Sequence, residues 1–359
     1  IVKDLPSKGD HHNNQLTAGP DGKIYFGQGT VTNSGVVGAD NFMMGWLRMH
    51  PFAHDVSARP IRLKDRPFVT INPIMLASEK QTPMARTSAF KPFGQTGTEI
   101  KVDSKANGTI LRMNPDGSGL EVYAWGLRNP FGCMWGPDGK LYATDNGFDE
   151  RGSRPIGNAP DALWVIREGA WYGWPDFTAG IPVTDPRFKP SYGEQPEFLL
   201  AEHPPVEKPF IMLPQHVGVT KIDFCTSDRF GYRGQLFIAE FGDQDPMTGR
   251  VREPQGRQVI LVDSTSGKTE KFFSVKDNAK GTGKGGLQYV DTSGPKRPVD
   301  VRFSGDALYV VDFGAFAMVE GATPVPQPVP GTGVVWRITR EGTKAGGPPA
   351  NLSILAAKQ

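Results

Sequence analysis

The sequence contains a short repeat that joins a tight turn to an alternating apolar segment. Its two clearest copies read Pro-Asp-Gly-Lys-Ile-Tyr-Phe-Gly over residues 20–27 and Pro-Asp-Gly-Lys-Leu-Tyr-Ala-Thr-Asp over residues 137–145. Asp-Gly supplies the positive φ that tight hairpin turns need, and alternating apolar residues are typical of strands. Weaker copies cover residues 234–240 and 305–312. The repeat therefore predicts four strands of one kind, each preceded by a turn.

A second apolar segment follows each copy of the repeat at a variable distance. Its copies are residues 109–113, 162–166, 258–262 and 334–338. Two strand types that alternate four times predict an all-β fold, a β-propeller of four-stranded blades. A β-sandwich is the structural alternative, but it does not predict a pairwise repeat. A parallel α/β fold is disfavoured, because no sustained amphipathic helix lies between the strands.

Two long stretches interrupt the repeat, residues 31–107 and residues 174–215, and both are rich in proline, glycine and polar residues. A blade takes about 40–45 residues, so 359 residues have room for six to eight blades, of which about four are legible. Long insertions in a propeller project from one face and commonly build its binding site. We expect one propeller domain over residues 1–359 that carries both stretches as insertions.

Composition narrows the function classes. The net charge is only +2, from 40 basic and 38 acidic residues, which argues against nucleic acid as a partner. No apolar stretch approaches the roughly 18 residues needed to cross a bilayer, so we expect no membrane span. The two cysteines, Cys133 and Cys225, lie in apolar segments that resemble strands, and we expect both to be buried small hydrophobes rather than a disulfide or a metal cage.

Two short motifs carry side chains suited to acid–base chemistry and to anion binding. His11 and His12 directly precede the first strand, and imidazole is the natural general base near neutral pH; the alternative is a pair of polar loop residues. Arg128 and Asn129 stand in a Gly-Leu-Arg-Asn-Pro motif and offer donors to an anionic or carbonyl-rich ligand. The alternative for this motif is a structural turn.

Three further features leave two interpretations each. Residues 145–155 combine carboxylates, an amide and glycine, which suits Ca²⁺ or a solvated turn in which Asp149 pairs with Arg151. The aromatic motif at residues 171–175 suits sugar stacking or packing between blades. His216 opens a later strand and is either a residue of the same central channel or an ordinary loop histidine.

The order of these motifs along the chain is more specific than any one of them. A histidine loop, a Pro-Asp-Gly-Lys strand, Gly-Leu-Arg-Asn-Pro, a second Pro-Asp-Gly-Lys strand, Asp-Asn-Gly and Tyr-Gly-Trp-Pro follow one another. In this order the sequence resembles the soluble glucose/sorbosone dehydrogenases. The resemblance implies a six-bladed propeller that uses pyrroloquinoline quinone (PQQ) together with Ca²⁺.

The resemblance also implies roles for single residues. His11 falls at the position of the catalytic base, and Arg128, with Asn129, at the pair that contacts the quinone, where Arg128 also stabilises the developing charge. Backbone carbonyls at the positions of Gly147 and Phe148 hold the calcium, with an acidic residue close by at the position of Asp161. Arg297 matches a cofactor-binding arginine. Two family cations are missing, because Val299 and Gly242 stand at their positions.

The implied activity is the oxidation of an aldose or related sugar alcohol by hydride transfer to the quinone. It comes with an electron acceptor such as a cytochrome and with a periplasmic or secreted location. Family members place about two blades before the catalytic histidine, whereas ten residues precede it here. We therefore expect that this sequence lacks N-terminal blades and that another chain or fragment completes the propeller.

Two other functions remain open on the same fold. One is a non-catalytic binding propeller that has lost its cofactor. The other is a calcium-dependent lactonase that uses carboxylates around the channel, namely Asp145, Asp161, Asp223 and Asp312.

Overall fold

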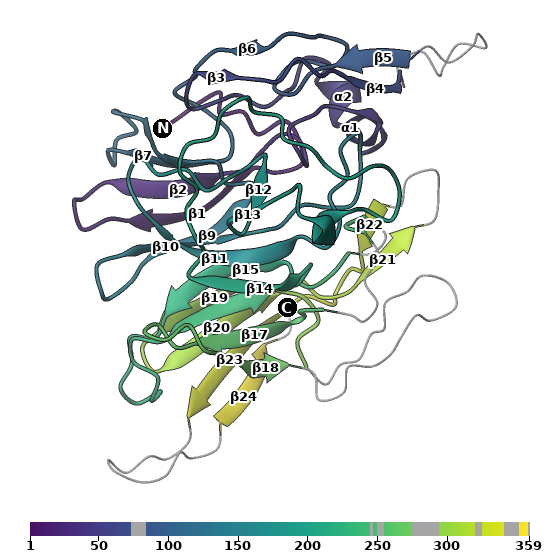
Figure 1. The fold of residues 1–359 in the computed structure, drawn as a ribbon. Coiled ribbons are helices and arrows are strands. Elements are labelled where there is room, and N and C mark those ends of the chain that lie inside the picture. The colour runs from purple at the N-terminus through teal and green to yellow at the C-terminus, as the bar shows by residue number, and fades with distance from the viewer. Residues whose placement is uncertain are drawn as a thin grey trace.

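The computed structural model describes residues 1–72, 84–244, 247–249, 255–274, 294–319, 325–340 and 352–357. Over these ranges the chain forms four antiparallel sheets of four strands, here called blades I to IV (Figure 1). Blade I contains β1 (Asn13–Ala18), β2 (Ile24–Gln28), β7 (Thr109–Met113) and β8 (Glu121–Trp125). Blade II contains β9 (Pro130–Trp135), β10 (Leu141–Asp145), β11 (Pro160–Ile166) and β14 (Ile211–Gln215). Blade III contains β15 (Val219–Phe224), β16 (Leu236–Glu240), β17 (Gln258–Val262) and β18 (Thr269–Ser274). Blade IV contains β19 (Pro298–Ser304), β20 (Ala307–Asp312), β23 (Val334–Arg340) and β24 (Leu352–Ala357).

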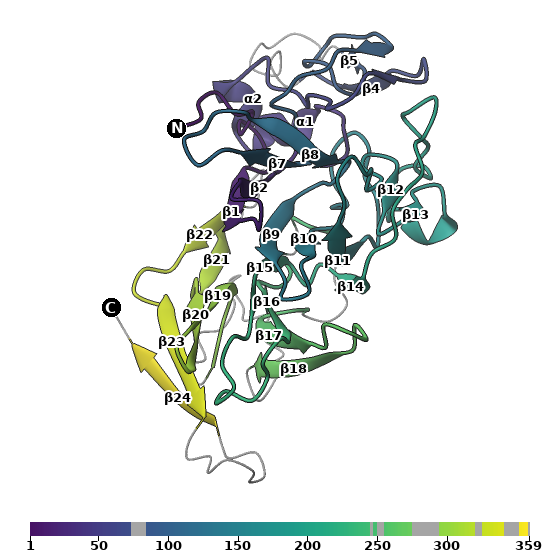
Figure 2. The same cartoon turned by 90° about the vertical axis from the view of Figure 1, so that its left-hand side faces the viewer.

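The blades follow one another around an arc (Figure 2), with the first strands β1, β9, β15 and β19 packed against each other at the centre. The predicted β-propeller of four-stranded blades is confirmed. Each pair of predicted strands forms the two middle strands of one blade, β2 with β7, β10 with β11, β16 with β17 and β20 with β23.

The middle strands read as nearly continuous apolar runs because both of their faces are buried. In β10, Leu141 and Ala143 pack in a core shared with blade I, whereas Tyr142 between them packs in a core shared with blade III. Because alternate side chains point to opposite faces of the sheet, each blade packs against both of its neighbours. Cys133 and Cys225 are buried and free, as predicted.

The Pro-Asp-Gly-Lys repeat makes the same turn in two blades. Gly22 and Gly139 adopt φ values of 77° and 76°, a left-handed conformation that glycine adopts without strain. In both turns the aspartate carboxylate accepts a hydrogen bond from the tyrosine hydroxyl four residues later, Tyr25 to Asp21 at 2.8 Å and Tyr142 to Asp138 at 3.0 Å. The two copies of the repeat therefore share one geometry, because the aspartate of the turn also bonds the tyrosine of the following strand.

Two long segments leave the blades. Between β2 and β7 lie α1 (Ala39–Met43), α2 (Trp46–Met49), β3 (Ile61–Arg62), β4 (Phe68–Ile71), β5 (Met84–Thr87) and β6 (Glu99–Ile100), which gather at the blade I end of the molecule in Figures 1 and 2. Residues 73–83 of this predicted insertion lie outside the described residues. Between β11 and β14 lie β12 (Phe177–Thr178), β13 (Ile181–Pro182) and the 3-10 helix η1 (Pro186–Phe188). The predicted boundary of this insertion at residue 215 is wrong, because Ile211–Gln215 forms β14. A further hairpin in blade IV contains β21 (Phe316–Val319) and β22 (Val325–Pro328).

Asp176 ties the second insertion to the rest of the protein. Its carboxylate has no exposed surface and accepts hydrogen bonds from the backbone N–H groups of Leu199 and Leu200, from His203 and from Arg154. Arg154 in turn donates to the backbone oxygen of Ser34 in the first insertion. One buried ion pair therefore joins both insertions.

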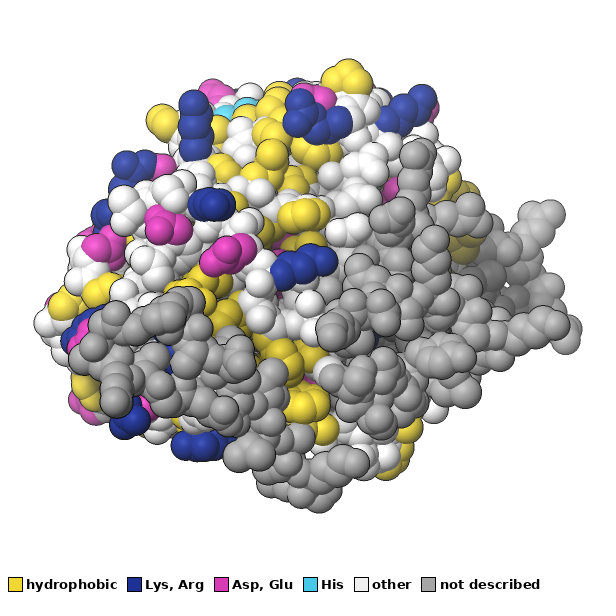
Figure 3. Space-filling view, turned by 90° about the horizontal axis from the view of Figure 1, so that it is seen from below, with side chains coloured by type: hydrophobic (Ala, Val, Ile, Leu, Met, Phe, Trp, Pro, Cys, Tyr) yellow, Lys and Arg dark blue, Asp and Glu magenta, His cyan; other side chains and the backbone are white. Residues whose placement is uncertain are grey.

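The described residues contain no helix that is long and apolar enough to cross a membrane. On the face shown in Figure 3, basic and acidic side chains are interspersed, and no broad region of one charge sign is visible.

Replacing Asp176 with alanine would leave Arg154 as an uncompensated buried charge. We expect the free energy of unfolding to fall by about 3–5 kcal/mol, measured by urea denaturation. The matched control is Asp185→Ala, because Asp185 caps the exposed turn η1 of the same insertion and its loss should cost only about 1 kcal/mol. Equal effects of the two substitutions would contradict the role assigned to Asp176.

Candidate active site

A cavity of about 380 Å³ opens among the loops that enter and leave the central strands. Residues from before β1, from the β8–β9 and β10–β11 loops and from blades III and IV line it together. The polar lining residues are Asp10, His11, His12, Arg128, Asn129, Asn146, Asp149, Arg151, Asp161, His216, Thr220, Gln244 and Thr248. The predicted residues His11, Arg128, Asn129, Gly147 and Asp161 thus meet at one cavity, although up to 150 positions separate them along the chain.

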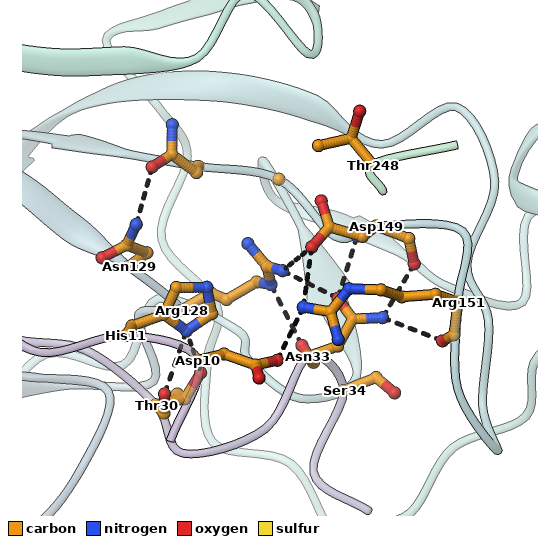
Figure 4. A network of polar contacts seen from close by, with 12 residues as sticks. Asp10, His11, Thr30, Asn33, Ser34, Arg128, Asn129, Asp149, Arg151 and Thr248 are labelled. Atoms are coloured by element: carbon orange, nitrogen blue, oxygen red, sulfur yellow. Dashed lines mark hydrogen bonds and ion pairs between the residues drawn. The ribbon is translucent and has the colours of Figure 1, made fainter. Parts of the chain in front are cut away.

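His11 has one fixed ring nitrogen and one that is left for the cavity (Figure 4). Its Nδ1 lies 2.9 Å from the backbone oxygen and 3.0 Å from the hydroxyl oxygen of Thr30. The Thr30 hydroxyl donates to the backbone oxygen of Thr32, so Nδ1 must carry the proton and Nε2 keeps its lone pair. A Cβ at Gly29 would lie 2.4 Å from the Cβ of His11, so the close approach of this segment requires glycine.

Electrostatics keep this imidazole neutral. Burial, followed by the nearby guanidinium of Arg128, lowers the pKa of His11 well below the ordinary value of 6.5, and Arg151 lowers it further. Asp149 acts in the opposite direction but does not outweigh them. At neutral pH the cavity therefore contains an unprotonated base.

Arg128 and Asn129 are held by their backbone as well as by their side chains. The carboxylate of Asp145, at the end of β10, accepts both of their backbone N–H groups. The guanidinium of Arg128 donates through Nε and Nη2 to Asn33 and through Nη2 to Asp149 at 2.7 Å. Its Nη1 makes no hydrogen bond within the described residues and remains for a ligand.

Arg151 forms ion pairs with three carboxylates. It pairs with Asp10 at 2.6 Å and with Asp149 at 3.1 Å (Figure 4). It also pairs with Asp40 of α1 at 2.8 Å. Burial raises the pKa of Asp40 to about 6 although Arg151 opposes the shift. Burial would also raise the pKa of Asp149, but Arg128 and Arg151 outweigh it and lower that pKa. The network joins the histidine segment, the first insertion and the β10–β11 loop.

The residues expected around calcium differ in whether their oxygen atoms are already hydrogen-bonded. The backbone oxygens of Gly147 and Phe148 accept no hydrogen bond within the described residues, and backbone oxygens suit calcium. Gly147 lines the cavity, whereas Phe148 does not and packs its side chain in a hydrophobic core. Asp161 already accepts backbone N–H groups of Gly147, Gly218 and Val219, and burial raises its pKa. No group of three or more histidine, cysteine or acidic side chains in the described ranges is arranged to hold a metal. The calcium ligands stay a prediction.

Part of the cavity lining is apolar and is here called the apolar wall. It includes Phe241, Gly242, Val299 and Phe313. Arg297 lies behind this wall, where its Nη1 donates to the backbone oxygens of Phe241 and Asp243. Burial, aided by Arg257, lowers the pKa of Arg297 to about 9. Its predicted contact with a cofactor stays a prediction.

Sequence reasoning missed three residues that shape the site, namely Thr30, Asn33 and Asp40. Each contacts a predicted residue across at least 19 positions of the chain, and no local motif marks them. The alternative for residues 145–155 was a solvated turn in which Asp149 pairs with Arg151. The pair is present, but both side chains are largely buried rather than solvated. Trp171, Tyr172 and Trp174 are buried, so these aromatic side chains pack between elements and offer no open stacking face.

Together the fold and this cavity define a β-propeller with a polar site at the centre of its blades. Residues 78–281, more than half of the chain, match the family model for glucose/sorbosone dehydrogenase. The chain therefore belongs to this family, as its motifs predicted.

Two curated proteins are similar to parts of the sequence. An uncharacterized protein of Borreliella burgdorferi is 29% identical over 224 residues, which cover 60% of this chain and 52% of that protein. Quinoprotein glucose dehydrogenase B of Acinetobacter calcoaceticus is 24% identical over 178 residues, which cover 49% of this chain and 28% of that protein. The chain thus spans about half or less of the length of the curated relatives it matches.

Solved structures of similar proteins align over most of the chain with low scores. The PQQ-bound aldose sugar dehydrogenase of Streptomyces coelicolor is 14% identical with a TM-score of 0.36, covering 99% of this chain and 98% of that one. The PQQ domain of pyranose dehydrogenase from Coprinopsis cinerea is 15% identical with a TM-score of 0.41, covering 85% and 91%.

Replacing Arg151 with methionine would leave three carboxylates facing one another. We expect the free energy of unfolding to fall by about 3–5 kcal/mol. The pKa of His11 should rise, because a cation that lowers it is gone while the carboxylates remain. Urea denaturation and an NMR titration of the His11 ring measure the two effects. Arg151→Lys keeps the charge and should leave the His11 pKa near its original value; an unchanged pKa in the methionine variant would refute the charge balance.

His11 also predicts a pH dependence of stability. Its pKa is well below 6.5 in the folded protein and about 6.5 in the unfolded chain. When the pH falls below about 6.5, the unfolded state therefore binds a proton that the folded state does not bind, and the free energy of unfolding decreases. Relative to His11→Asn, the wild type should lose up to about 2 kcal/mol between pH 7.5 and pH 5, measured by urea denaturation. A constant difference between the two proteins would contradict the lowered pKa.

Proposed function

We propose that this protein is a quinone-dependent oxidoreductase that oxidises a hydroxyl group of an aldose or a related sugar alcohol. The observation that carries the proposal is the neutral His11, whose Nδ1 is fixed by Thr30 and whose Nε2 is left for the cavity beside Arg128. Membership of the glucose/sorbosone dehydrogenase family supports it.

His11 is suited to remove the proton of a substrate hydroxyl. Its Nε2 accepts without first losing a proton, because the ring is neutral at physiological pH. The bond from Nδ1 to the backbone oxygen of Thr30 holds the tautomer and stabilises the imidazolium that forms. Proton transfer therefore occurs at one defined atom.

The donor set of the cavity fits a quinone at one end. Arg128, through its unpaired Nη1, and Asn129 would hold the quinone oxygens, and the carbonyls of Gly147 and Phe148 would serve a calcium ion beside it. When bound, PQQ would supply the hydride acceptor, and calcium would polarise it. The apolar wall of Phe241, Val299 and Phe313 excludes water from a planar ligand and its substrate.

The alternatives are supported by fewer observations. The carboxylates required by a lactonase, Asp145, Asp161, Asp223 and Asp312, all accept backbone N–H groups, so they serve the fold and are not free to activate water. A binding propeller without a cofactor is favoured only by Val299 and Gly242, which replace two family cations. We also propose that the protein passes electrons to an acceptor such as a cytochrome and that it is periplasmic or secreted. Both proposals follow from the resemblance to the family.

The test is reconstitution with PQQ and Ca²⁺, followed by dye reduction upon addition of an aldose. We expect the wild type to shift the quinone absorbance and to reduce the dye. His11→Ala should bind PQQ with similar affinity but lose at least about 10²-fold in turnover, since general base catalysis contributes this much. His54→Ala removes a histidine outside the cavity and should retain activity. Absence of a spectral change in the wild type at saturating PQQ would leave the binding propeller as the better function.

A further inference from the structure

His216 adopts an unusual backbone conformation at the edge of the cavity. It follows β14, is 7% exposed and lines the cavity. Its φ is +56°, in the left-handed region where a side chain costs free energy that glycine would not. Side chains that persist in such strained positions near a pocket are candidates for function.

The imidazole of His216 has no hydrogen-bond partner within the described residues. In contrast, His11 is bonded to Thr30, and His203 to Asp176. Neither ring nitrogen of His216 belongs to the enclosed polar atoms that lack a partner, so both remain accessible from the cavity. Buried polar groups normally have a hydrogen-bond partner. Since the imidazole of His216 faces the cavity and has none within the described residues, its nitrogens are available to a ligand.

The backbone around His216 is bonded directly to the apolar wall. The N–H of Gly242 donates to the backbone oxygen of Val217 at 2.8 Å, and that of Phe241 to Gly218 at 2.8 Å. His216 therefore stands beside the part of the wall where Gly242 and Val299 provide no donor. His216 is among the groups that lower the pKa values of Asp149 and Asp161. Both carboxylates already accept hydrogen bonds from other groups.

We propose that His216 is a ligand-binding residue, whose imidazole donates a hydrogen bond to an anionic oxygen of the quinone cofactor at this wall. The inference rests on the proposed function. It assigns the left-handed backbone a purpose, because this conformation brings the ring to the cavity edge.

The experiment measures PQQ affinity in the presence of Ca²⁺, by titration of the quinone absorbance, together with the melting temperature. His216→Gly keeps the left-handed backbone without strain, so we expect an unchanged or higher melting temperature and an affinity at least about tenfold weaker. His216→Leu keeps bulk without a donor and should weaken binding equally, which makes the test independent of the glycine variant's folding. His216→Asn tolerates a positive φ and can donate, so it should recover most of the affinity.

The matched control is Asn158→Gly. Asn158 is exposed, has a φ of +54° and lies outside the cavity, so its variant should bind PQQ like the wild type. Unchanged PQQ affinity in both His216→Gly and His216→Leu would overturn the role of His216 while the proposed function stands. Failure of the wild type to bind PQQ would overturn both.

Discussion

The fold depends on a polar residue that ends the second strand of each blade and meets the first residue of the inner strand. Gln28, Asp145, Glu240 and Asp312 occupy this position. In two blades its carboxylate accepts the backbone N–H groups just before the inner strand, Asp145 those of Arg128 and Asn129, and Asp312 those of Lys296 and Arg297. A buried N–H without an acceptor is costly, so this residue fixes the path of the loop. The same bond that satisfies the loop therefore aims Arg128 at the cavity.

Charge balance is the second constraint on the site. Two guanidinium groups, Arg128 and Arg151, are buried among the carboxylates of Asp10, Asp40 and Asp149. Each buried charge is tolerated only because its partner is close and well oriented. The chain meets this condition by bringing together a segment before β1, a helix of the first insertion and the loop after β10. The insertion is thus part of the site rather than an appendage to the propeller.

Much of the fold could be predicted from sequence, because its signals are local. The Asp-Gly turns and the alternating apolar segments carry their own geometry, and all eight predicted strands exist. The structure adds that the two strands of each repeat pair with each other. The end of the second insertion was misplaced because β14, Ile-Met-Leu-Pro-Gln, pairs only along part of its length and contains a proline that argues against a strand. The partners of the site residues were harder to predict. Asn33 belongs to the first insertion and meets Arg128 only once this insertion has packed against the loop before β9. Thr30 meets His11 because backbone hydrogen bonds continue the β1–β2 hairpin beyond its strands.

The lowered pKa of His11 bears on the kind of reaction that the cavity can support. A base with a low pKa is always ready to accept a proton, but it is intrinsically weak. It is poorly matched to a reaction in which it alone must activate water, as in hydrolysis. It is better matched to a reaction in which hydride leaves the carbon that bears the hydroxyl group. The hydroxyl becomes more acidic as the hydride leaves, so a weak base is sufficient to remove its proton. The environment that keeps His11 neutral, burial beside two guanidinium groups, is therefore compatible with the alcohol oxidation proposed above.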